Sequence, residues 1–441
     1  MKKTLATILA LVLTLSLCSI AWATETQQEN VAKVGDTEYA TLQAAIDAVS
    51  DGENTVVLLK DLKESITIAS GKNITLDLNG KTLTNEAGKH TITNNGTLTI
   101  TATNGGTVDN VSHARAALFN NEGATAVLNG GSFTRSQENG KTKEDSGNNS
   151  FYTIQNLGTM TINAGVSVTQ NGCFSSMVAN GYYNGTGKTN TPTMIINGGT
   201  FSGGLNTVKN DDCGVMTING GEFKNFAQAC VQNHNKLTIT NGNFDGSELK
   251  AIADSTVSVI YNCGCGADND KGMLSISGGT FSGGKEETYV ICDVSTVSEA
   301  YTDISGGTFT TGSATMIGKT ASAKVAISGG TFSSDVDAYV AADKIVQKDG
   351  NTYKVVADGA ITSGTYTSQP TVPSGYKATK NDDGTWTVSK ISYYYYPSTS
   401  DTTTSTTTKG SPKTFDAGIA LYVGMALTSV TGLAYTGKKK F

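Results

Sequence analysis

Proline and arginine are both scarce in this chain, and each shortage limits what the chain can be. Only 5 of the 441 residues are proline, and four of the five lie at or after Pro370. Proline removes a main-chain donor from a sheet ladder, so its near absence before that point favours continuous strand pairing. The arginines are Arg115 and Arg135 alone, and both precede the residues that carry candidate chemistry.

The two ends of the chain resemble export and anchoring signals. Residues 1–23 combine two lysines, an apolar run and an Ala-Trp-Ala cleavage site, which predicts a secretory signal peptide. Residues 417–435 form an apolar stretch long enough to span a bilayer, and a basic tail follows them. We therefore expect the protein to be exported and retained at the cell surface.

A motif, an apolar span and a basic tail follow one another in residues 411–441, as in the sorting signal of Gram-positive cell-wall proteins. Pro412, Lys413 and Thr414 match that resemblance, which implies cleavage after the threonine and attachment to peptidoglycan. Phe415 replaces the usual glycine, so an uncut membrane anchor is the alternative. Residues 393–410 are rich in Tyr, Ser and Thr and are predicted to form a flexible stalk.

The charge balance is acidic. The formal net charge is −6, and removing residues 1–23 (two lysines) and 415–441 (three lysines and one aspartate) gives −6 − 2 − 2 = −10. Phosphate binding requires a basic surface, so nucleic acid is disfavoured as a partner.

The middle of the chain repeats the pattern Ile-x-x-Gly-x-Phe, and a weaker copy, LNGGSF, begins at Leu128. The commonest step between copies is about 22 residues, which is too long for a heptad and indicates a stacked β architecture. The step that follows the third copy is much the longest. The six isoleucines that open the copies are Ile196, Ile218, Ile239, Ile276, Ile304 and Ile327.

Each repeat is predicted to form one coil of parallel strands. The isoleucine points inward, the glycines turn a corner, and Phe223 stacks between Phe201 and Phe244. We expect ladders of like residues and roughly 15 coils. Asparagine is expected at one corner of the coil, at Asn197, Asn219 and Asn241. The long step after Ile239 is expected to project residues Tyr261–Asp270 as an insert.

A helix is predicted before the first coil. Thr41 is the expected N-cap, and Leu42, Ala45, Ile46 and Val49 share one helical face. Such a helix covers the first strand edge of an open stack.

Residues 31–390 resemble the right-handed parallel β-helix of the pectin-lyase-like superfamily, and in particular non-catalytic surface proteins of Gram-positive bacteria. The resemblance rests on the opening segment Val34–Leu42, on ITLDLNGK from Ile74, and on the ISGGTF coils. It implies an all-β solenoid with an N-terminal segment and helix at 24–52. Coils would occupy residues 53–340 and closing segments residues 341–392.

One motif favours an enzyme. Asn210-Asp211-Asp212-Cys213 resembles the paired aspartates of polygalacturonases, and His234 lies one coil further along the chain. The family's third aspartate, the glycines around its histidine and its basic substrate-binding motif are missing. The alternative places Asp211 and Asp212 at a corner on a solvated loop, and we expect that arrangement.

Six cysteines follow the signal, and both disulfides and buried thiols remain open. They are Cys173, Cys213, Cys230, Cys263, Cys265 and Cys292. Asp268-Asn269-Asp270 begins like a calcium loop but lacks the closing glutamate, so Ca²⁺ is only a weak candidate and no cofactor or metal is expected. His90 and His113 stand alone and are expected to be structural.

These observations together predict a surface-anchored, non-enzymatic β-helix protein. It is expected to serve as an adhesin or a glycan-contacting module. Partners would be a polysaccharide or a neighbouring cell surface, with peptidoglycan or membrane at its C-terminal tail. A diverged polysaccharide lyase or hydrolase carried by Asp211, Asp212 and His234 is one alternative, and a passive spacer of the cell envelope is the other.

Overall fold

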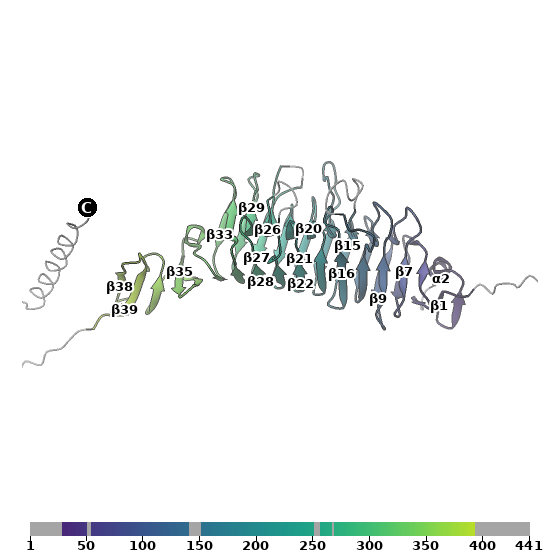
Figure 1. Cartoon of the computed structure of the whole chain (residues 1–441), viewed down its shortest axis with the longest axis horizontal. Coiled ribbons are helices and arrows are strands. Elements are labelled where there is room, and N and C mark those ends of the chain that lie inside the picture. Colours follow the sequence, from purple (N-terminus) through teal and green to yellow (C-terminus); the bar gives the residue numbers. More distant parts are fainter. Residues whose placement is uncertain (1–28, 51–53, 141–150, 251–255, 267–268, 393–441) are drawn as a thin grey trace, which may run out of the picture. The chain divides into compact units, whose positions relative to one another are not determined.

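The computed structural model describes residues 29–50, 54–140, 151–250, 256–266 and 269–392 (Figure 1). The predicted signal peptide, stalk, sorting motif Pro412–Phe415 and apolar span 417–435 lie outside these ranges. Among the described residues, no helix is both long and apolar enough to cross a bilayer.

The described chain is an all-β solenoid, as the repeat predicts. Successive strands enter three different sheets in turn, and neighbouring coils pair in parallel. Eleven parallel strands, β3 to β33, stack in the first sheet, so the described residues hold eleven coils and the expectation of roughly 15 was too high. Long loops explain the difference, because several coils take far more of the chain than the shortest repeats do.

The first sheet has thirteen strands. The predicted helix is present, but a strand that was not predicted there, Ala32–Val34, hydrogen-bonds to the first coil strand. Two antiparallel strands and helix α2 (Leu42–Ala48) lie at the first edge of the sheet, and the Thr41 hydroxyl accepts a hydrogen bond from the Ala44 amide at 3.1 Å. In spatial order the strands are β2 (Thr37–Tyr39), β1 (Ala32–Val34), β3 (Thr55–Leu58), β6 (Asn73–Asp77), β9 (Thr97–Thr101), β12 (Thr125–Leu128), β15 (Thr159–Ile162), β18 (Thr193–Ile196), β21 (Val215–Ile218), β24 (Lys236–Ile239), β27 (Met273–Ile276), β30 (Tyr301–Ile304) and β33 (Val325–Ile327).

The second sheet has sixteen strands and ends in an antiparallel segment with a small core of its own. A short 3₁₀ turn, Asp337–Tyr339, precedes that segment. The strands are β38 (Tyr376–Lys380), β39 (Trp386–Lys390), β37 (Gly364–Tyr366), β35 (Lys344–Asp349), β36 (Thr352–Ala357), β34 (Thr331–Phe332), β31 (Thr308–Thr310), β28 (Thr280–Ser282), β25 (Asn243–Asp245), β22 (Glu222–Lys224), β19 (Thr200–Gly203), β16 (Val166–Gln170), β13 (Gly131–Thr134), β10 (Thr107–Asp109), β7 (Thr82–Thr84) and β4 (Leu62–Lys63).

The third sheet has ten strands, and the candidate site lies where its strands end. They are β32 (Thr315–Lys319), β29 (Tyr289–Asp293), β26 (Ser258–Asn262), β23 (Ala229–Asn233), β20 (Asn206–Asn210), β17 (Val178–Asn180), β14 (Ile154–Asn156), β11 (Leu118–Asn120), β8 (Ile92–Asn94) and β5 (Ile66–Ile68).

The phenylalanines of the repeat stack on the inner face of the second sheet, as predicted. Their ring centroids are 4.6 to 4.9 Å apart and their planes lie within 7° of parallel. Strand spacing fixes this distance, so the coil repeat itself imposes the stack. The rings belong to Phe201, Phe223, Phe244, Phe281, Phe309 and Phe332, and all are buried.

The paired glycines of the repeat have distinct roles. Gly307 has a φ of +104°, which an L side chain rarely adopts. A Cβ on Gly306 would collide with the Ser277 carbonyl oxygen of the preceding coil. The second glycine therefore turns the corner, and the first allows close stacking.

Two details of the sequence prediction were wrong. The corner ladder runs from Asn219 to Asn197 at 3.0 Å, but Thr240 continues it instead of Asn241, because Thr240 directly follows Ile239 as Asn219 follows Ile218. Tyr261 belongs to strand β26 and not to an insert. The long step instead comes from the segments on either side of β26.

His90 is structural, as expected. Its ring stacks on Phe119 with centroids 4.7 Å apart, and its Nδ1 accepts a hydrogen bond from the Ala116 amide at 2.8 Å. Burial, together with the positive charge of Arg115, lowers the pKa of His90 to about 4. The ring is therefore neutral in the folded protein near neutral pH.

Replacing Phe244 by alanine should lower the free energy of unfolding by about 3–5 kcal/mol, because a buried ring leaves a cavity. Phe201→Ala is the matched control, since Phe201 has one stacked neighbour and Phe244 has two. The Phe244 variant should be the less stable by about 0.5–1.5 kcal/mol, as measured by denaturant unfolding. Equal losses would show that stacking adds nothing to burial.

His90 should make folding sensitive to mild acid. Its pKa is lower in the folded chain than in the unfolded one, so the unfolded state binds more protons between pH 6.5 and pH 4. The wild type should lose about 1–2 kcal/mol relative to His90→Gln across that window, a value that allows for the partly exposed ring. Above pH 7 the difference between the two should be constant. Unfolding measured at several pH values tests this, and a constant difference down to pH 4 would contradict it.

Candidate functional site

A buried ladder of seven amide side chains and one carboxylate lies at the ends of eight strands of the third sheet. Each Nδ2 donates to the next carboxamide or carboxylate oxygen, at distances of 2.7 to 3.1 Å. All eight side chains are fully buried, so each hydrogen bond satisfies a group that water cannot reach. The members are Asn94, Asn120, Asn156, Asn180, Asn210, Asn233, Asn262 and Asp293.

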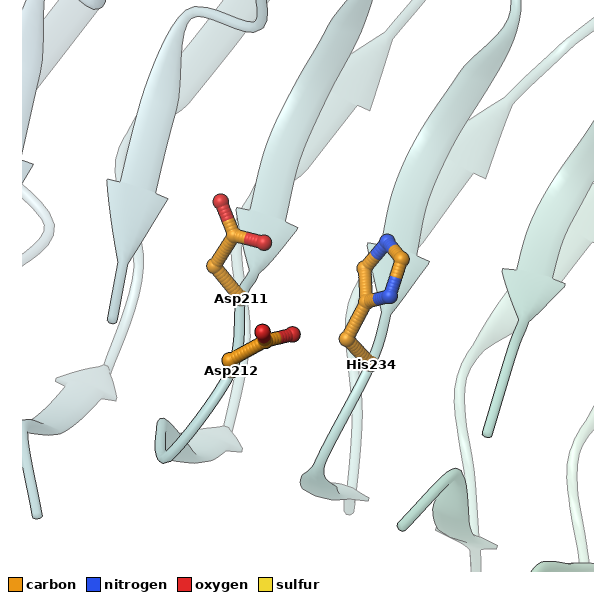
Figure 2. Close-up of side chains that lie close together, drawn as sticks. All are labelled: Asp211, Asp212 and His234. Atoms are coloured by element: carbon orange, nitrogen blue, oxygen red, sulfur yellow. The ribbon is translucent and has the colours of Figure 1, made fainter. Parts of the chain in front are cut away.

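This ladder positions the residues that follow it. Asn210 pairs with Asn233 across neighbouring coils. Asp211 and His234 come directly after these two residues, so they occupy equivalent places one coil apart. The predicted proximity of the aspartate pair and His234 is thus correct: one polar atom each from Asp211, Asp212 and His234 lies within 4.8 Å of the others (Figure 2).

Asp211 lies beneath a lysine and a tyrosine. Its side chain is 2% exposed, and one carboxylate oxygen lies 3.0 Å from Lys209 Nζ. The Tyr152 hydroxyl lies 3.4 Å from the other oxygen. Burial and the charge of Asp211 raise the pKa of Tyr152, so its hydroxyl stays protonated and faces the carboxylate.

Asp212 is also buried, at 5% exposure. One of its oxygens accepts a hydrogen bond from the Gly185 amide at 2.8 Å. Burial raises the pKa of Asp212, and the charges of Asp211 and Asp270 add to this effect. The prediction that both aspartates lie on a solvated loop is therefore wrong, because Tyr152 and the segment that contains Gly185 cover them.

A fourth group, Asp270, comes from the loop between β26 and β27. Its side chain is 5% exposed, and its Oδ1 lies 3.6 Å from His234 Nδ1, which is too far for a hydrogen bond. Its Oδ2 accepts from the Cys265 amide at 3.0 Å. Among the described residues, Asp270 Oδ1 and both ring nitrogens of His234 are buried without a hydrogen-bond partner.

The cysteines fall into two groups. Cys263 and Cys265 form a disulfide within the loop that carries Asp270. Cys213, Cys230 and Cys292 are buried thiols, so the two arrangements that the sequence left open both occur. Burial raises the pKa of Cys292 to about 12, which keeps that thiol protonated and unreactive.

A pocket of about 260 Å³ adjoins the cluster along the chain, because Cys213 follows Asp212 and Asn235 follows His234. Asn190, which stands where the resembled hydrolases carry a further aspartate, lines this pocket. Among the described residues, Lys236 and Lys271 form no ion pair. The pocket lining is Lys188, Thr189, Asn190, Thr191, Cys213, Val215, Asn235, Lys236, Asn269, Lys271 and Met273.

Sequence reasoning missed Asp270, Lys209 and the three pocket lysines. Asp270 was assigned to a weak calcium loop, but its carboxylate faces His234. Lys209 could have been found, because strand alternation places it next to Asp211 on the outer side of β20. The lysines come from three separate loops and strands, so no local motif marks them.

Comparison of the chain with family models, with curated proteins and with solved structures finds no match in any of the three. The geometry of the site alone therefore decides between functions.

The carboxylates of Asp211, Asp212 and Asp270 should repel one another and so destabilise the folded chain when no cation is bound to them. Asp212→Asn keeps an acceptor for the Gly185 amide and removes one of three close carboxylates. In chelator at pH 7 it should raise the free energy of unfolding by about 0.5–2 kcal/mol. Denaturant unfolding provides the measurement.

Asp77→Asn is the matched control for this change, because the Asp77 carboxylate accepts three hydrogen bonds, from Thr103 N, Thr103 Oγ1 and Asn79 N. That variant should be less stable than the wild type. If both variants lose stability, the carboxylates of the cluster do not oppose folding.

Proposed function

We propose that this chain is an exported, surface-held β-helix protein of right-handed, pectin-lyase-like type that binds acidic glycans without cleaving them. The observation that carries the proposal is the pocket lined by Lys188, Lys236 and Lys271 together with the amides of three asparagines. Ammonium and amide groups are suited to the carboxylates and hydroxyls of an acidic sugar.

The local charge is what makes the pocket selective. The chain as a whole is acidic, at −6, so its surface repels polyanions in general. A pocket with three lysines has the opposite sign to this overall charge. An acidic glycan would be held by charge at that place.

The outer face of the second sheet is suited to an extended polymer. The residues that flank the stacked phenylalanines point outward, and most of them are short and hydroxylated. Threonine and serine lose little entropy when they bind. The register aligns one outward column along the coils. Four of its six members are threonines and the other two are Glu222 and Asn243; the threonines are Thr200, Thr280, Thr308 and Thr331.

Tyr183 adds an aromatic surface near the cluster. Its side chain is 82% exposed, and Lys209 Nζ lies 5.5 Å from its ring centroid. An exposed ring beside polar groups is a suitable platform for the apolar face of a sugar.

A second candidate, a polysaccharide lyase or hydrolase, is favoured by the closeness of Asp211, Asp212 and His234. Two carboxylates and a histidine can act as acid and base on a glycosidic bond. However, the full burial of Asp211 and its pairing with Lys209 leave it little access to a sugar. Binding without turnover therefore fits the site better.

Binding should be strong for polygalacturonate and weak for dextran in affinity gel electrophoresis. Replacing both Lys236 and Lys271 by alanine should weaken polygalacturonate binding at least about tenfold, since each charge-assisted contact contributes about 1.5–3 kcal/mol. Lys63→Ala combined with Lys354→Ala removes the same charge from exposed lysines away from the pocket and should change binding little.

Three results would overturn the proposal. Equal weakening by the two double variants would exclude the pocket as the site. Retention on neither glycan would favour a passive spacer. New reducing or unsaturated chain ends that disappear in Asp212→Asn would establish the enzyme.

A further inference from the structure

We propose that Asp211, Asp212 and His234 bind one divalent transition cation of the Mn²⁺ to Zn²⁺ class, and that Asp270 orients the histidine. The site stands on its own geometry and does not rest on glycan binding. It is distinct from the weak calcium loop considered for residues 268–270, because the ligands come from two neighbouring coils.

The distances are suited to one ion. The three candidate ligand atoms lie within 4.8 Å of one another. Ligand atoms that share an ion at about 2.1 Å lie about 3–4 Å apart, so modest side-chain rotations close the site. Figure 2 shows the Asp212 carboxylate extending toward the His234 ring from the adjacent coil.

Unpartnered buried atoms are the second, independent observation. Both ring nitrogens of His234 are buried without a partner among the described residues, as is Oδ1 of Asp270, whose side chain is 5% exposed. Leaving such groups unsatisfied costs about 1–3 kcal/mol each. A cation on Nε2, with Nδ1–H turned to Asp270, satisfies all three atoms.

That arrangement is the usual second shell of a metal-bound histidine. A carboxylate that accepts the other ring N–H fixes the tautomer and the ring orientation. Asp270 Oδ1 already lies 3.6 Å from Nδ1, and its other oxygen is held by the Cys265 amide. Asp270 is thus a positioning residue and not a ligand.

The charges identify the ion. Three carboxylates (Asp211, Asp212 and Asp270) and Lys209 sum to −3 + 1 = −2, which a dication neutralises. An imidazole nitrogen with carboxylates is suited to Mn²⁺ through Zn²⁺, whereas Ca²⁺ prefers six to eight oxygens. Three protein ligands leave a coordination position for water.

Calorimetric titration of the full chain with ZnCl₂, after EDTA treatment and under non-reducing conditions, tests the proposal. The wild type should bind one Zn²⁺ per chain. Asp212→Asn and His234→Ala should each weaken binding at least about tenfold. Asp270→Asn should weaken it about tenfold, and Asp270→Glu should restore part of the loss.

The controls separate this site from others. His113→Ala and Asp303→Asn change the same residue types elsewhere and should leave Zn²⁺ affinity unchanged. Cys213→Ser should do the same, since the thiol is not a ligand in this scheme. Co²⁺ bound to the wild type should give a visible absorption band, which Asp270→Asn should shift because the imidazole turns.

The proposal is overturned if Zn²⁺ affinity survives in His234→Ala, or if it is lost in Cys213→Ser alone. It is also overturned if CaCl₂ binds as tightly as ZnCl₂ and does so equally in His234→Ala. Thermal unfolding in EDTA checks that each variant is folded. Should His234→Ala fail to fold, Asp212→Asn decides, because it is expected to be more stable than the wild type without metal.

Discussion

Hydrogen bonding between equivalent residues of successive coils is the interaction on which the rest of this structure depends. The asparagine ladder of the third sheet shows this most directly. Each Nδ2 donates to the side-chain oxygen one coil ahead, from Asn94 as far as Asp293. Because the side chains are fully buried, removing one member takes a hydrogen-bond partner from both of its neighbours in the ladder, and water cannot replace it. The ladder therefore fixes the register at the ends of eight strands of the third sheet. A site whose residues come from neighbouring coils requires such a fixed register.

The fixed register holds like charges together at the candidate site, which lowers the stability of the fold. Asp211 and His234 directly follow two ladder residues, so their backbone cannot move apart without breaking buried hydrogen bonds. Three carboxylates are held close together in a place where water is largely excluded, and the pKa of Asp212 is raised as a result. Such strain is tolerated at functional sites when the surrounding scaffold imposes it. The same rigid placement also prepares the groups for a ligand of opposite charge, because the cost of bringing them together is met on folding.

Much of the fold could be predicted from the sequence, because a coil repeat turns sequence spacing directly into distance. The phenylalanine stack and the proximity of His234 to the aspartates both follow from steps of about one coil. Asp270 could not be predicted in this way. It lies in a loop between strands, and loop length does not set position. The burial of Asp211 was missed because its cover comes from Tyr152, which is 59 residues away in the sequence. The ladder was missed because its asparagines lie outside the Ile-x-x-Gly-x-Phe motif and follow one another at unequal steps.

The carboxylate cluster and the lysine pocket adjoin each other, so a ligand bound at one should affect the charge felt at the other. Cys213 and Asn235 line the pocket and directly follow Asp212 and His234, so a region of net charge −2 adjoins one with three ammonium groups. Without a cation, the carboxylates would repel an acidic sugar. With a dication in place the cluster is neutral and no longer repels an acidic sugar in the adjoining pocket. On this view a cation and an acidic glycan would bind cooperatively, and the coupling would arise from charge alone without movement of the scaffold.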